Sequence, residues 1–441
     1  MRIKWFAAPL ALALLLGACG SGDDNDGADA SPDTDTEGAD GDDGAAADGD
    51  ADPVTLSMWV FNGMGFDDMV ARYQEENSHV TIEMQQTEYS DHHDAMINAL
   101  AAGGGPDIAA IEVGFINDMA EQAQVWTNLY DLGARDVEDR YLDWKIEQAR
   151  SVDGEALIGL PTDIGGMAIA YRHDLFEEAG MPFERDEVSA AWVDSWEDYL
   201  AFGEEYTANS GRAFYDNEEL LWNAVVNQSP DTFYDDQGNP IFDESEQVQY
   251  AWDVVNQAID ADIGADIAAW SEEWNAGMSN GDFAVLTAPA WMMGYIQDNA
   301  PDQAGNWDIA EVPEAGGNWG GSHLGIPAAS ENAEEAYAFI EWLLNEEQQL
   351  EAFRENGNFP SIPTLFDTPE IQEFANPYFN DAPVGPIYAD NAERVIAQNT
   401  GPNFNSISTE FQDALGRVND GVESPDEAWN SAITEINNIL G

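Results

Sequence analysis

Lysine, cysteine and positive charge are scarce in this sequence. It has 13 Lys and Arg residues against 87 Asp and Glu residues, and a single Cys among 441 residues. The resulting net charge of −74 repels phosphate backbones and anionic headgroups, which excludes nucleic-acid binding. One cysteine cannot form an internal disulfide, a Cys-rich zinc site or an iron–sulfur cluster. No GxxxxGK[ST] motif is present, so a P-loop is excluded as well.

The shortage of lysine suggests where such a protein works. Only Lys4 and Lys145 are lysines, whereas short, strongly hydrated carboxylates dominate the charged residues. A carboxylate-covered surface repels itself at low salt, and concentrated salt screens that repulsion. We therefore favour a protein adapted to brine over an acid-rich protein of ordinary habitat. The hydrophobic content of 44% and the 15 Trp residues exclude a wholly disordered polyanion and indicate buried cores.

The N-terminus has the pattern of an exported lipoprotein. Arg2 and Lys4 precede the twelve-residue apolar run 5–16, which is too short to span a bilayer and is typical of a signal peptide. The following Leu-Gly-Ala-Cys resembles a bacterial lipobox, in which Cys19 would receive a diacylglyceryl group. We predict a signal peptide over 1–18 and lipidation of Cys19, and the alternative is an ordinary signal peptide followed by an accidental cysteine.

The next segment cannot form a core. From Gly20 to Pro53 it has twelve Asp, one Glu, no Lys or Arg, and no apolar residue larger than Ala. Such a composition stays disordered, and its charges extend it. We expect 19–53 to be a lipid-anchored acidic tether that holds the folded part away from the membrane.

Alternating strand and helix patterns predict an α/β fold after the tether. Short apolar runs of strand length are separated by helical periodicity, which favours a parallel sheet covered by helices. The predicted strands are Val54–Val60, Val80–Thr87, Ile108–Val113, Leu157–Pro161, Met167–Arg172 and Phe283–Thr287.

Capping patterns locate several helices. Asp174–Ala179 should end at Gly180, and Ser195 to Asp198 has the form of a capping box for a helix through Ala208. Asn332 is expected to cap an amphipathic helix, and residues 404–418 and 425–440 read as two final helices. His92 and His93 are adjacent on a predicted helix, and we expect both to be exposed rather than to bind a metal.

Aromatic residues give the clearest indication of a ligand. Indole rings offer flat apolar faces to the C–H faces of sugar rings, and nearby carboxylates and amides can bind hydroxyl groups. Trp59, Trp291 and Trp319 lie at ends of predicted strands or in Gly-rich loops, where ligand sites of α/β sheets form. Trp196 and Trp342 lie within helical patterns and are predicted to be core residues. Carboxylates are too abundant for any pair of them to indicate an acid/base site.

Five segments in order resemble a known family. The chain is similar to the family-1 extracellular solute-binding proteins, relatives of the maltose-binding protein that serve ABC sugar importers. The resemblance covers essentially all of 54–441 and rests on PDIAAIEVGF (106–115), GLPTDIGGMAIAYRHDLFEEAG (159–180), FAVLTAPAW (283–291), GGSHLGIPAASENAEEAYAFIEWL (320–343) and ESPDEAWNSAITEI (423–436).

The resemblance implies a two-lobed periplasmic-binding-protein fold of type II with a hinged cleft between the lobes. The N-lobe would comprise 54–163 plus 322–376, and the C-lobe 164–321 plus 377–441. Crossing segments would fall near Thr162–Gly165, near Ser322–Gly325 and around 370–385.

The resemblance also implies ligand contacts. They would come from the end of the first strand, the residues after the PDI strand, the first crossing, the APAW segment and the Gly-rich loop, with a weaker candidate in the second lobe. The candidates are Trp59, Asn62, Glu112, Phe115, Asp163, Asn227, Trp291, Trp319, Gly320 and Gly321. A glutamate of the maltose type at the first crossing is replaced by Gly165, which argues against malto-oligosaccharides.

The function implied is capture of a sugar or oligosaccharide for an ABC permease, without catalysis, cofactor or metal. The expected protein is a monomer on the outer face of the cell membrane that touches the membrane only through its lipid anchor. Two alternatives remain open. One is an anchored glycoside hydrolase, which needs two carboxylates about 5–10 Å apart across a cleft. The other is the same fold binding an organic cation such as a polyamine through cation–π contacts.

The acidic composition generates a prediction about salt. Because salt screens carboxylate repulsion, we expect the melting temperature to rise with NaCl concentration and the fold to loosen below roughly 0.5 M salt. Circular dichroism melts across an NaCl series measure this directly. A melting temperature that does not change with salt contradicts the interpretation.

Overall fold

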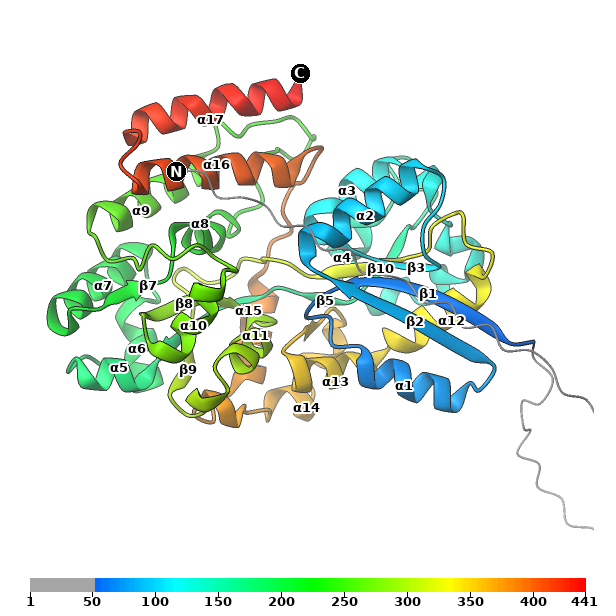
Figure 1. Cartoon of the computed structure of the whole chain (residues 1–441), viewed down its shortest axis with the longest axis horizontal. Coiled ribbons are helices and arrows are strands. Elements are labelled where there is room, and N and C mark those ends of the chain that lie inside the picture. The colour runs from blue at the N-terminus through cyan, green and yellow to red at the C-terminus, as the bar shows by residue number, and fades with distance from the viewer. Residues whose placement is uncertain (1–51) are drawn as a thin grey trace, which may run out of the picture. The chain divides into compact units, whose positions relative to one another are not determined.

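The computed structural model describes residues 52–441 (Figure 1). The predicted signal peptide, Cys19 and the tether through residue 51 lie outside the described residues. No helix within 52–441 combines the length and the apolar character needed to cross a bilayer.

The first sheet has five strands in the order β2-β1-β3-β10-β4. β1 (Val54–Phe61) pairs in parallel with β2 (Val80–Thr87) and β3 (Ile108–Glu112), as the alternating pattern predicted. β10 (Ser322–Gly325) returns from far along the chain and lies antiparallel between β3 and β4 (Gly159–Pro161).

The second sheet has four strands in the order β7-β8-β6-β9. β6 (Met167–Arg172) and β8 (Phe283–Pro289) are buried along their whole length, which explains their continuous apolar sequences. β7 (Ala213–Tyr215) and β9 (Trp307–Ala310) form the edges. The α/β class with two sheets, which the family resemblance implied, is confirmed. The expectation of a parallel sheet holds only for β1 with β2 and β3 and for β7 with β8, because β10 and β6 pair antiparallel with their neighbours.

The chain passes between the sheets through short extended segments. β5 (Asp163–Ile164) lies at the predicted first crossing and pairs with β11 (Phe359–Pro360). The second predicted crossing, 322–325, is β10 itself, which is paired inside the first sheet. The chain therefore returns to the first sheet just before β10, in the Gly-rich segment that contains Trp319.

Helices cover both sheets, and α16 and α17 lie together over α8 and α9 (Figure 1). The helices are α1 (Asp67–Glu76), α2 (Tyr89–Ala101), α3 (Val113–Glu121), α4 (Asp143–Gln148), α5 (His173–Glu178), α6 (Arg185–Trp192), α7 (Trp196–Ser210), α8 (Glu218–Val226), α9 (Glu246–Asp260), α10 (Glu272–Asn280), α11 (Met292–Asn299), α12 (Ala333–Leu343), α13 (Glu346–Asn356), α14 (Pro369–Gln372), α15 (Val384–Arg394), α16 (Phe404–Asn419) and α17 (Pro425–Leu440). Short 3-10 turns lie at Ala123–Val125, Leu129–Leu132, Ala134–Asp136, Glu138–Arg140, Pro301–Gln303, Pro363–Leu365 and Pro377–Phe379.

Caps set several helix starts. The Ser195 side chain accepts the Asp198 backbone N–H at the start of α7, as predicted. Ser424 and Glu427 form a full capping box on α17. Asn332 is the N-cap residue of α12, as predicted, but its side chain makes no capping hydrogen bond, and its amide donates instead to Asp107 Oδ1 at 3.1 Å. A half-buried carboxylate therefore holds this side chain in place of the helix terminus.

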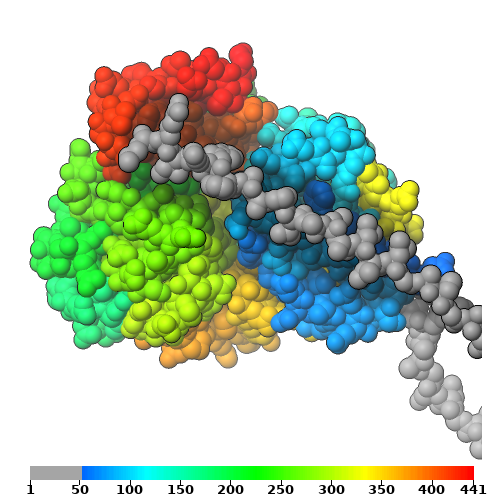
Figure 2. Space-filling view, in the orientation of Figure 1, coloured from blue at the N-terminus to red at the C-terminus, as the bar shows by residue number. Residues whose placement is uncertain are grey.

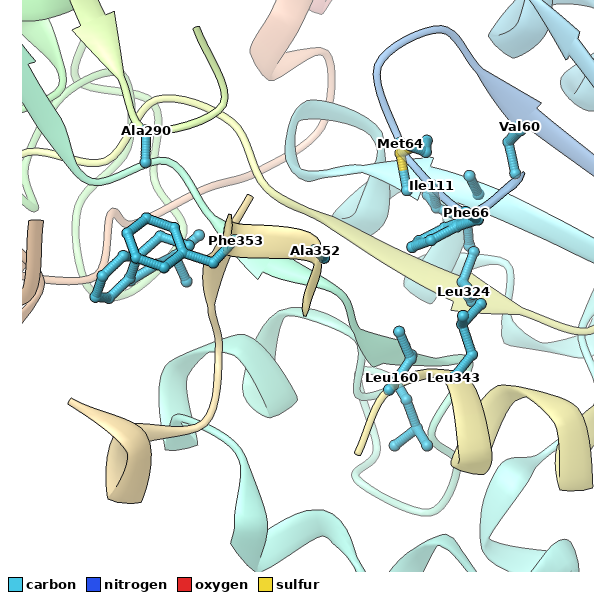
Figure 3. Close-up of a cluster of buried hydrophobic side chains, with 14 of the residues drawn as sticks. Val60, Met64, Phe66, Ile111, Leu160, Ala290, Leu324, Leu343, Ala352 and Phe353 are labelled. Atoms are coloured by element: carbon cyan, nitrogen blue, oxygen red, sulfur yellow. The ribbon is translucent and has the colours of Figure 1, made fainter. Parts of the chain in front are cut away.

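Two apolar clusters occupy the two faces of the second sheet. One extends from the first sheet to the β6 and β8 face that contains Ala168, Ala170 and Leu286, and Figure 3 shows part of it around Val60, Ile111 and Leu324. The other fills the opposite face under α7, α8, α9, α16 and α17. Figure 2 shows the surface of the protein, with blue to cyan residues and a yellow segment on the right and green and red residues on the left. Trp196 is fully buried as predicted, whereas Trp342 is only partly buried at the edge of the core.

The prediction that His92 and His93 are exposed is wrong. Both are almost completely buried, at 2% and 1% exposure. Neighbouring helix positions differ by about 100° and can share one broad buried stripe. Here both rings pack against Phe61, with centroid distances of 5.7 and 5.5 Å.

A close backbone contact fixes the Gly-rich segment against the first crossing. The Trp319 N–H donates to the Gly165 carbonyl oxygen at 2.9 Å, and the Asn318 side chain accepts the Gly165 N–H at 2.8 Å. A Cβ atom at residue 165 would lie 1.8 Å from the Trp319 carbonyl oxygen. Only glycine fits there, and any side chain would force the two segments apart.

This contact predicts the effect of Gly165→Ala. The added methyl group meets backbone atoms that cannot rotate away, so we expect a loss of unfolding free energy of about 2–3 kcal/mol. Urea denaturation in high salt measures it. Gly104→Ala is the matched control, because its nearest atom would be 3.8 Å away. Equal stability of the two variants contradicts the assigned contact.

Candidate functional site

Two carboxylates meet at one edge of the first sheet. Glu112 ends β3 and faces Ser322, the first residue of β10, while Thr162 on the other side donates its N–H to the Ser322 carbonyl oxygen at 2.9 Å. Asp163 follows directly, and its Oδ1 accepts the Ser322 N–H at 3.1 Å and the Thr162 hydroxyl. Strand pairing therefore brings Glu112 and Asp163 to the two sides of one residue.

Each of these carboxylates retains one oxygen for a ligand. Glu112 Oε2 accepts the Gly114 N–H at 2.7 Å and the Tyr89 hydroxyl at 2.9 Å. Among the described residues, Glu112 Oε1 and Asp163 Oδ2 have no hydrogen-bond partner. Burial raises the pKa of both carboxyl groups, and the hydrogen bonds oppose that rise. The pair can accept hydroxyl hydrogens from a ligand.

Four aromatic rings form a wall beside the Gly-rich segment. The aromatic wall consists of Trp270, Trp291, Tyr295 and Trp319. Trp291 lies between the other two indoles, 5.5 Å from Trp319 and 6.1 Å from Trp270 at an interplanar angle of 26°. Its indole N–H donates to the Trp319 carbonyl oxygen at 3.0 Å. Tyr295 packs edge-on against Trp270 at 5.5 Å.

Trp270 is the most exposed member of the wall and was not predicted. Its side chain is 43% exposed, although indoles are usually covered, and its backbone has a φ of 65°. It lies in the loop before Ser271, the N-cap of α10. A tryptophan directly before a helix cap, with no helical apolar pattern around it, is the sequence signal that could have identified this residue.

A second aromatic group surrounds Glu112. Phe115 stacks on His93 with a centroid distance of 4.1 Å and an interplanar angle of 11°, and Tyr89 lies 4.6 Å from the same imidazole. Burial lowers the pKa of His93 to about 3, so the ring is neutral. Its Nδ1 donates to the Tyr89 carbonyl oxygen, and its Nε2 accepts the Glu112 N–H. Tyr89, 40% exposed, is a further residue that sequence reasoning missed.

Polar contacts connect this group to residues from the second half of the fold. Asn62 donates to Glu88 at 2.9 Å, and the Glu88 charge contributes to the raised pKa of Tyr295 in the aromatic wall. On the other side, a Cβ atom at Gly114 would lie 2.0 Å from Asn405 Oδ1 in α16. The carboxylate edge and the aromatic wall are joined directly, because the Val113 N–H beside Glu112 donates at 3.0 Å to the carbonyl oxygen of Gly321, two residues after Trp319.

The predicted residues do not all converge. Glu112, Phe115, Asp163, Trp291, Trp319, Gly320 and Gly321 share the region, with Asn62 at its margin. The glycines permit close approach, because a Cβ at Gly320 would lie 2.8 Å from the Trp291 indole nitrogen. Trp59 lies within β1 and has no aromatic neighbour among the described residues. Asn227 is 9% exposed and already accepts the Gln398 amide at 2.7 Å.

The cavities of the described chain do not add a separate site here. A small cavity next to Asp163 measures about 10 Å³, which has room for about one water and not for a sugar. A surface groove of about 420 Å³ lies between α9 and the start of α17, where Trp252 and Trp429 are surrounded by acids and amides.

A GxSxG motif occurs among the described residues, but it does not form a hydrolase nucleophile elbow. Residues 277–281 match GxSxG, but they lie at the end of α10, and the Ser279 hydroxyl donates to the Asn299 carbonyl oxygen. A hydrolase nucleophile instead sits on a sharp strand-to-helix turn. No group of three or more metal-ligating side chains occurs within 52–441 either.

Comparison with known proteins identifies the family. Residues 68–378 match the family model described as bacterial extracellular solute-binding protein. The chain belongs to this family. A crystal structure titled extracellular solute-binding protein family 1 has a TM-score of 0.78 and 36% identity, covering 88% of this chain and all of that one. The family resemblance inferred from the sequence is confirmed. Members of this family act outside the cytoplasm, and they are binding proteins rather than enzymes.

Two further relatives extend the comparison. The arabinooligosaccharide-binding protein of Halalkalibacterium halodurans is 25% identical over 405 residues, covering 87% of this solute-binding protein and 84% of the relative. A binding protein from B. animalis subsp. lactis, solved in complex with beta-1,6-galactobiose, has a TM-score of 0.75 and 20% identity, covering 87% and 97% of the two chains. At 20% identity, the similarity to the galactobiose complex shows the fold alone.

Asp216 supports the aromatic wall from behind. Its Oδ2 accepts the Trp274 indole N–H at 2.8 Å, and Trp274 packs against Trp270 at 5.0 Å. Burial raises the pKa of Asp216 to about 7. In the unfolded chain this carboxyl group ionises near 4, so its contribution to stability is lost as the pH rises from about 4 to about 7.

Asp216→Asn should remove this pH dependence. The amide oxygen can still accept the Trp274 indole N–H. We therefore expect the unfolding free energy of the variant to rise by about 4 kcal/mol relative to that of the parent when the pH is raised from 4 to 8. Denaturation at both pH values in high salt measures the difference. The exposed control Asp68→Asn should leave it unchanged, and a constant parent-to-variant difference contradicts burial of an ionisable Asp216.

Proposed function

We propose that this solute-binding protein captures a sugar or an oligosaccharide outside the cytoplasm and delivers it to the permease of an ABC importer. The observation that carries the proposal is the meeting of two partly unpaired carboxylates with an aromatic wall in one region. Carboxylate oxygens accept hydroxyl hydrogens, and indole faces cover the C–H faces of sugar rings. Arabinooligosaccharide- and lactose-binding relatives support this ligand class.

The aromatic wall favours a ligand of more than one ring. Trp270, 43% exposed, offers the outer face of its stack with Trp291, and Trp319 offers a second indole at 71° to Trp291. Several indoles in a row offer stacking surface to successive sugar units. The relative solved with beta-1,6-galactobiose is consistent with such a ligand.

The proposed mechanism is capture without chemistry. The N-lobe would be 54–163 plus 322–376 and the C-lobe 164–321 plus 377–441, with Glu112 and Asp163 on one side of the ligand and the aromatic wall on the other. A ligand that touches both sides favours a closed state through its differential contacts, and the permease would bind that state. An affinity of about micromolar corresponds to about 8 kcal/mol.

Anchoring completes the proposal. A diacylglyceryl group on Cys19 would hold the chain at the outer face of the membrane, and the acidic segment to residue 53 would act as a spacer. Globomycin treatment and mass spectrometry of the processed chain test this step. A processed chain that begins elsewhere than Cys19 contradicts it.

A ligand panel tests the ligand class. Thermal shift in high salt should show stabilisation by at least one of arabinotriose, lactose and beta-1,6-galactobiose, because a bound ligand raises the melting temperature by mass action. Spermidine covers the second candidate, an organic cation on aromatic and acidic side chains. Stabilisation by spermidine alone would replace the sugar proposal, and release of product from chromogenic glycosides would replace capture by hydrolysis.

Single substitutions test the site. Asp163→Ala and Trp291→Ala should each weaken binding of the stabilising sugar by at least tenfold, which is 1.4 kcal/mol or more, because each removes one class of contact. Isothermal titration calorimetry measures the affinities, and circular dichroism checks the fold. Trp429→Ala, in the separate groove, should bind as the parent does. Full affinity in both site variants removes the proposed site.

A further inference from the structure

Lys145 is the one lysine of the described chain, and it is completely buried. Its side chain is 0% exposed in α4, and its Nζ has no hydrogen-bond partner among the described residues. No carboxylate oxygen within 52–441 lies within the 4.0 Å of a direct ion pair. An ammonium group without water or hydrogen-bond acceptors destabilises a protein unless opposite charges compensate it.

The helix that carries Lys145 packs beneath the carboxylate edge. α4 contacts α3, whose N-cap is Glu112, and β4, which ends two residues before Asp163, so Lys145 lies on an element packed against both carboxylate segments. The Lys145 carbonyl oxygen accepts the His323 ring N–H at 2.9 Å. His323 follows Ser322 on β10, so its side chain points to the opposite face of the sheet. Burial lowers the pKa of His323 well below its ordinary value, so this ring is neutral and adds no second cation.

The groups that act on Lys145 are the two candidate ligand carboxylates. Asp163 of β5 and Glu112 of β3 both raise the pKa of Lys145, against a larger lowering by burial, and it lies at about 8. Lys145 in turn lowers the pKa of both carboxyl groups. The other side chains that face it are the neutral His323 and the Trp144 ring, whose centroid is 5.6 Å from Nζ.

We propose that Lys145 is a positioning residue of the ligand site, whose buried ammonium group compensates Glu112 and Asp163 and keeps both as ionised acceptors for ligand hydroxyls. The inference rests on the proposed function for its ligand, but the charge coupling itself is independent of any ligand. A purely apolar role does not explain the residue, because methionine fills similar space without an unpaired charge. It also explains why a chain so poor in lysine has one at this buried position.

The first experiment measures the coupling without ligand. A full chain with Lys4→Arg and ¹³C-labelled lysine has a single lysine signal, from Lys145. NMR titration in high salt should give a midpoint near pH 8. Glu112→Gln and Asp163→Asn should each lower that midpoint, because each removes a negative charge that favours the ammonium form. An ordinary midpoint near 10.5, or one that neither variant changes, overturns the proposal.

The second experiment measures the consequence for binding. Arabinotriose is the probe, titrated calorimetrically from pH 4.5 to pH 7.5. Lys145→Met should weaken binding at least tenfold at pH 7 and move the acidic loss of affinity to higher pH by about one unit, because its carboxyl groups hold protons more strongly. Lys145→Arg, which keeps the charge, should restore most of the affinity and the parent pH profile. Parent-like binding and pH profile in Lys145→Met overturn the proposal.

The two experiments separate failure of this inference from failure of the proposed function. If arabinotriose does not bind the parent chain, that ligand is wrong, and the lysine titration alone decides the charge coupling. If arabinotriose binds and Lys145→Met fails to fold, Lys145→Arg still tests whether the buried positive charge supports binding. A folded Lys145→Arg that binds no better than the Asp163→Asn variant overturns the proposal.

Discussion

The geometry of the candidate site depends on the backbone contact between Trp319 and Gly165. That contact joins the outgoing segment after Asp163 to the returning segment before β10. The Trp319 carbonyl oxygen accepts the Trp291 indole, and the neighbouring Gly321 carbonyl oxygen accepts the Val113 N–H beside Glu112. Backbone atoms thus hold the aromatic wall and the carboxylate edge at fixed spacing, and the side chains of both remain available for a ligand.

The surroundings of Glu112 and Asp163, rather than the number of acids in the chain, distinguish these two as candidate ligand acceptors. The chain has 87 acids, and most of those within residues 52–441 are exposed, so their number says nothing about a site. Asp163 is 7% exposed, and burial raises its pKa, which would leave it a poor acceptor without a compensating charge. A neutral His93 orders the other side, because it stacks on Phe115 and accepts the Glu112 N–H. The surface acids are stabilised by water, whereas Glu112 and Asp163 are held in place by the residues packed around them.

Local patterns predicted the elements better than the site. The bounds of β2 and β6 match the predicted ranges, and α16 and α17 begin where expected, because periodicity and caps are encoded nearby in the sequence. The proximity of Asp163, Trp291 and Trp319 was predicted only through the family resemblance, because local sequence patterns carry no information about contacts between distant segments. Trp270 and Tyr89 were missed, since an exposed ring in a loop leaves no periodic signal. The burial of His92 and His93 depends on Phe61 packing over the helix, which no local pattern contains.

Gly165 connects the fold to ligand choice. An acidic side chain here would collide with the Trp319 carbonyl oxygen, so this position cannot supply an acceptor while the Gly-rich segment keeps its path. Acceptors are then confined to the sheet edge, at Glu112 and Asp163, and the opposite side is dominated by indole surface. Such a site would favour sugars whose hydroxyl groups point to the carboxylates while one C–H face stays free to stack on the indoles. A hydroxyl group that points to the indoles would lose its bound water without gaining a hydrogen-bond partner. The same backbone contact that builds the candidate site would therefore restrict the sugars captured in the proposed function.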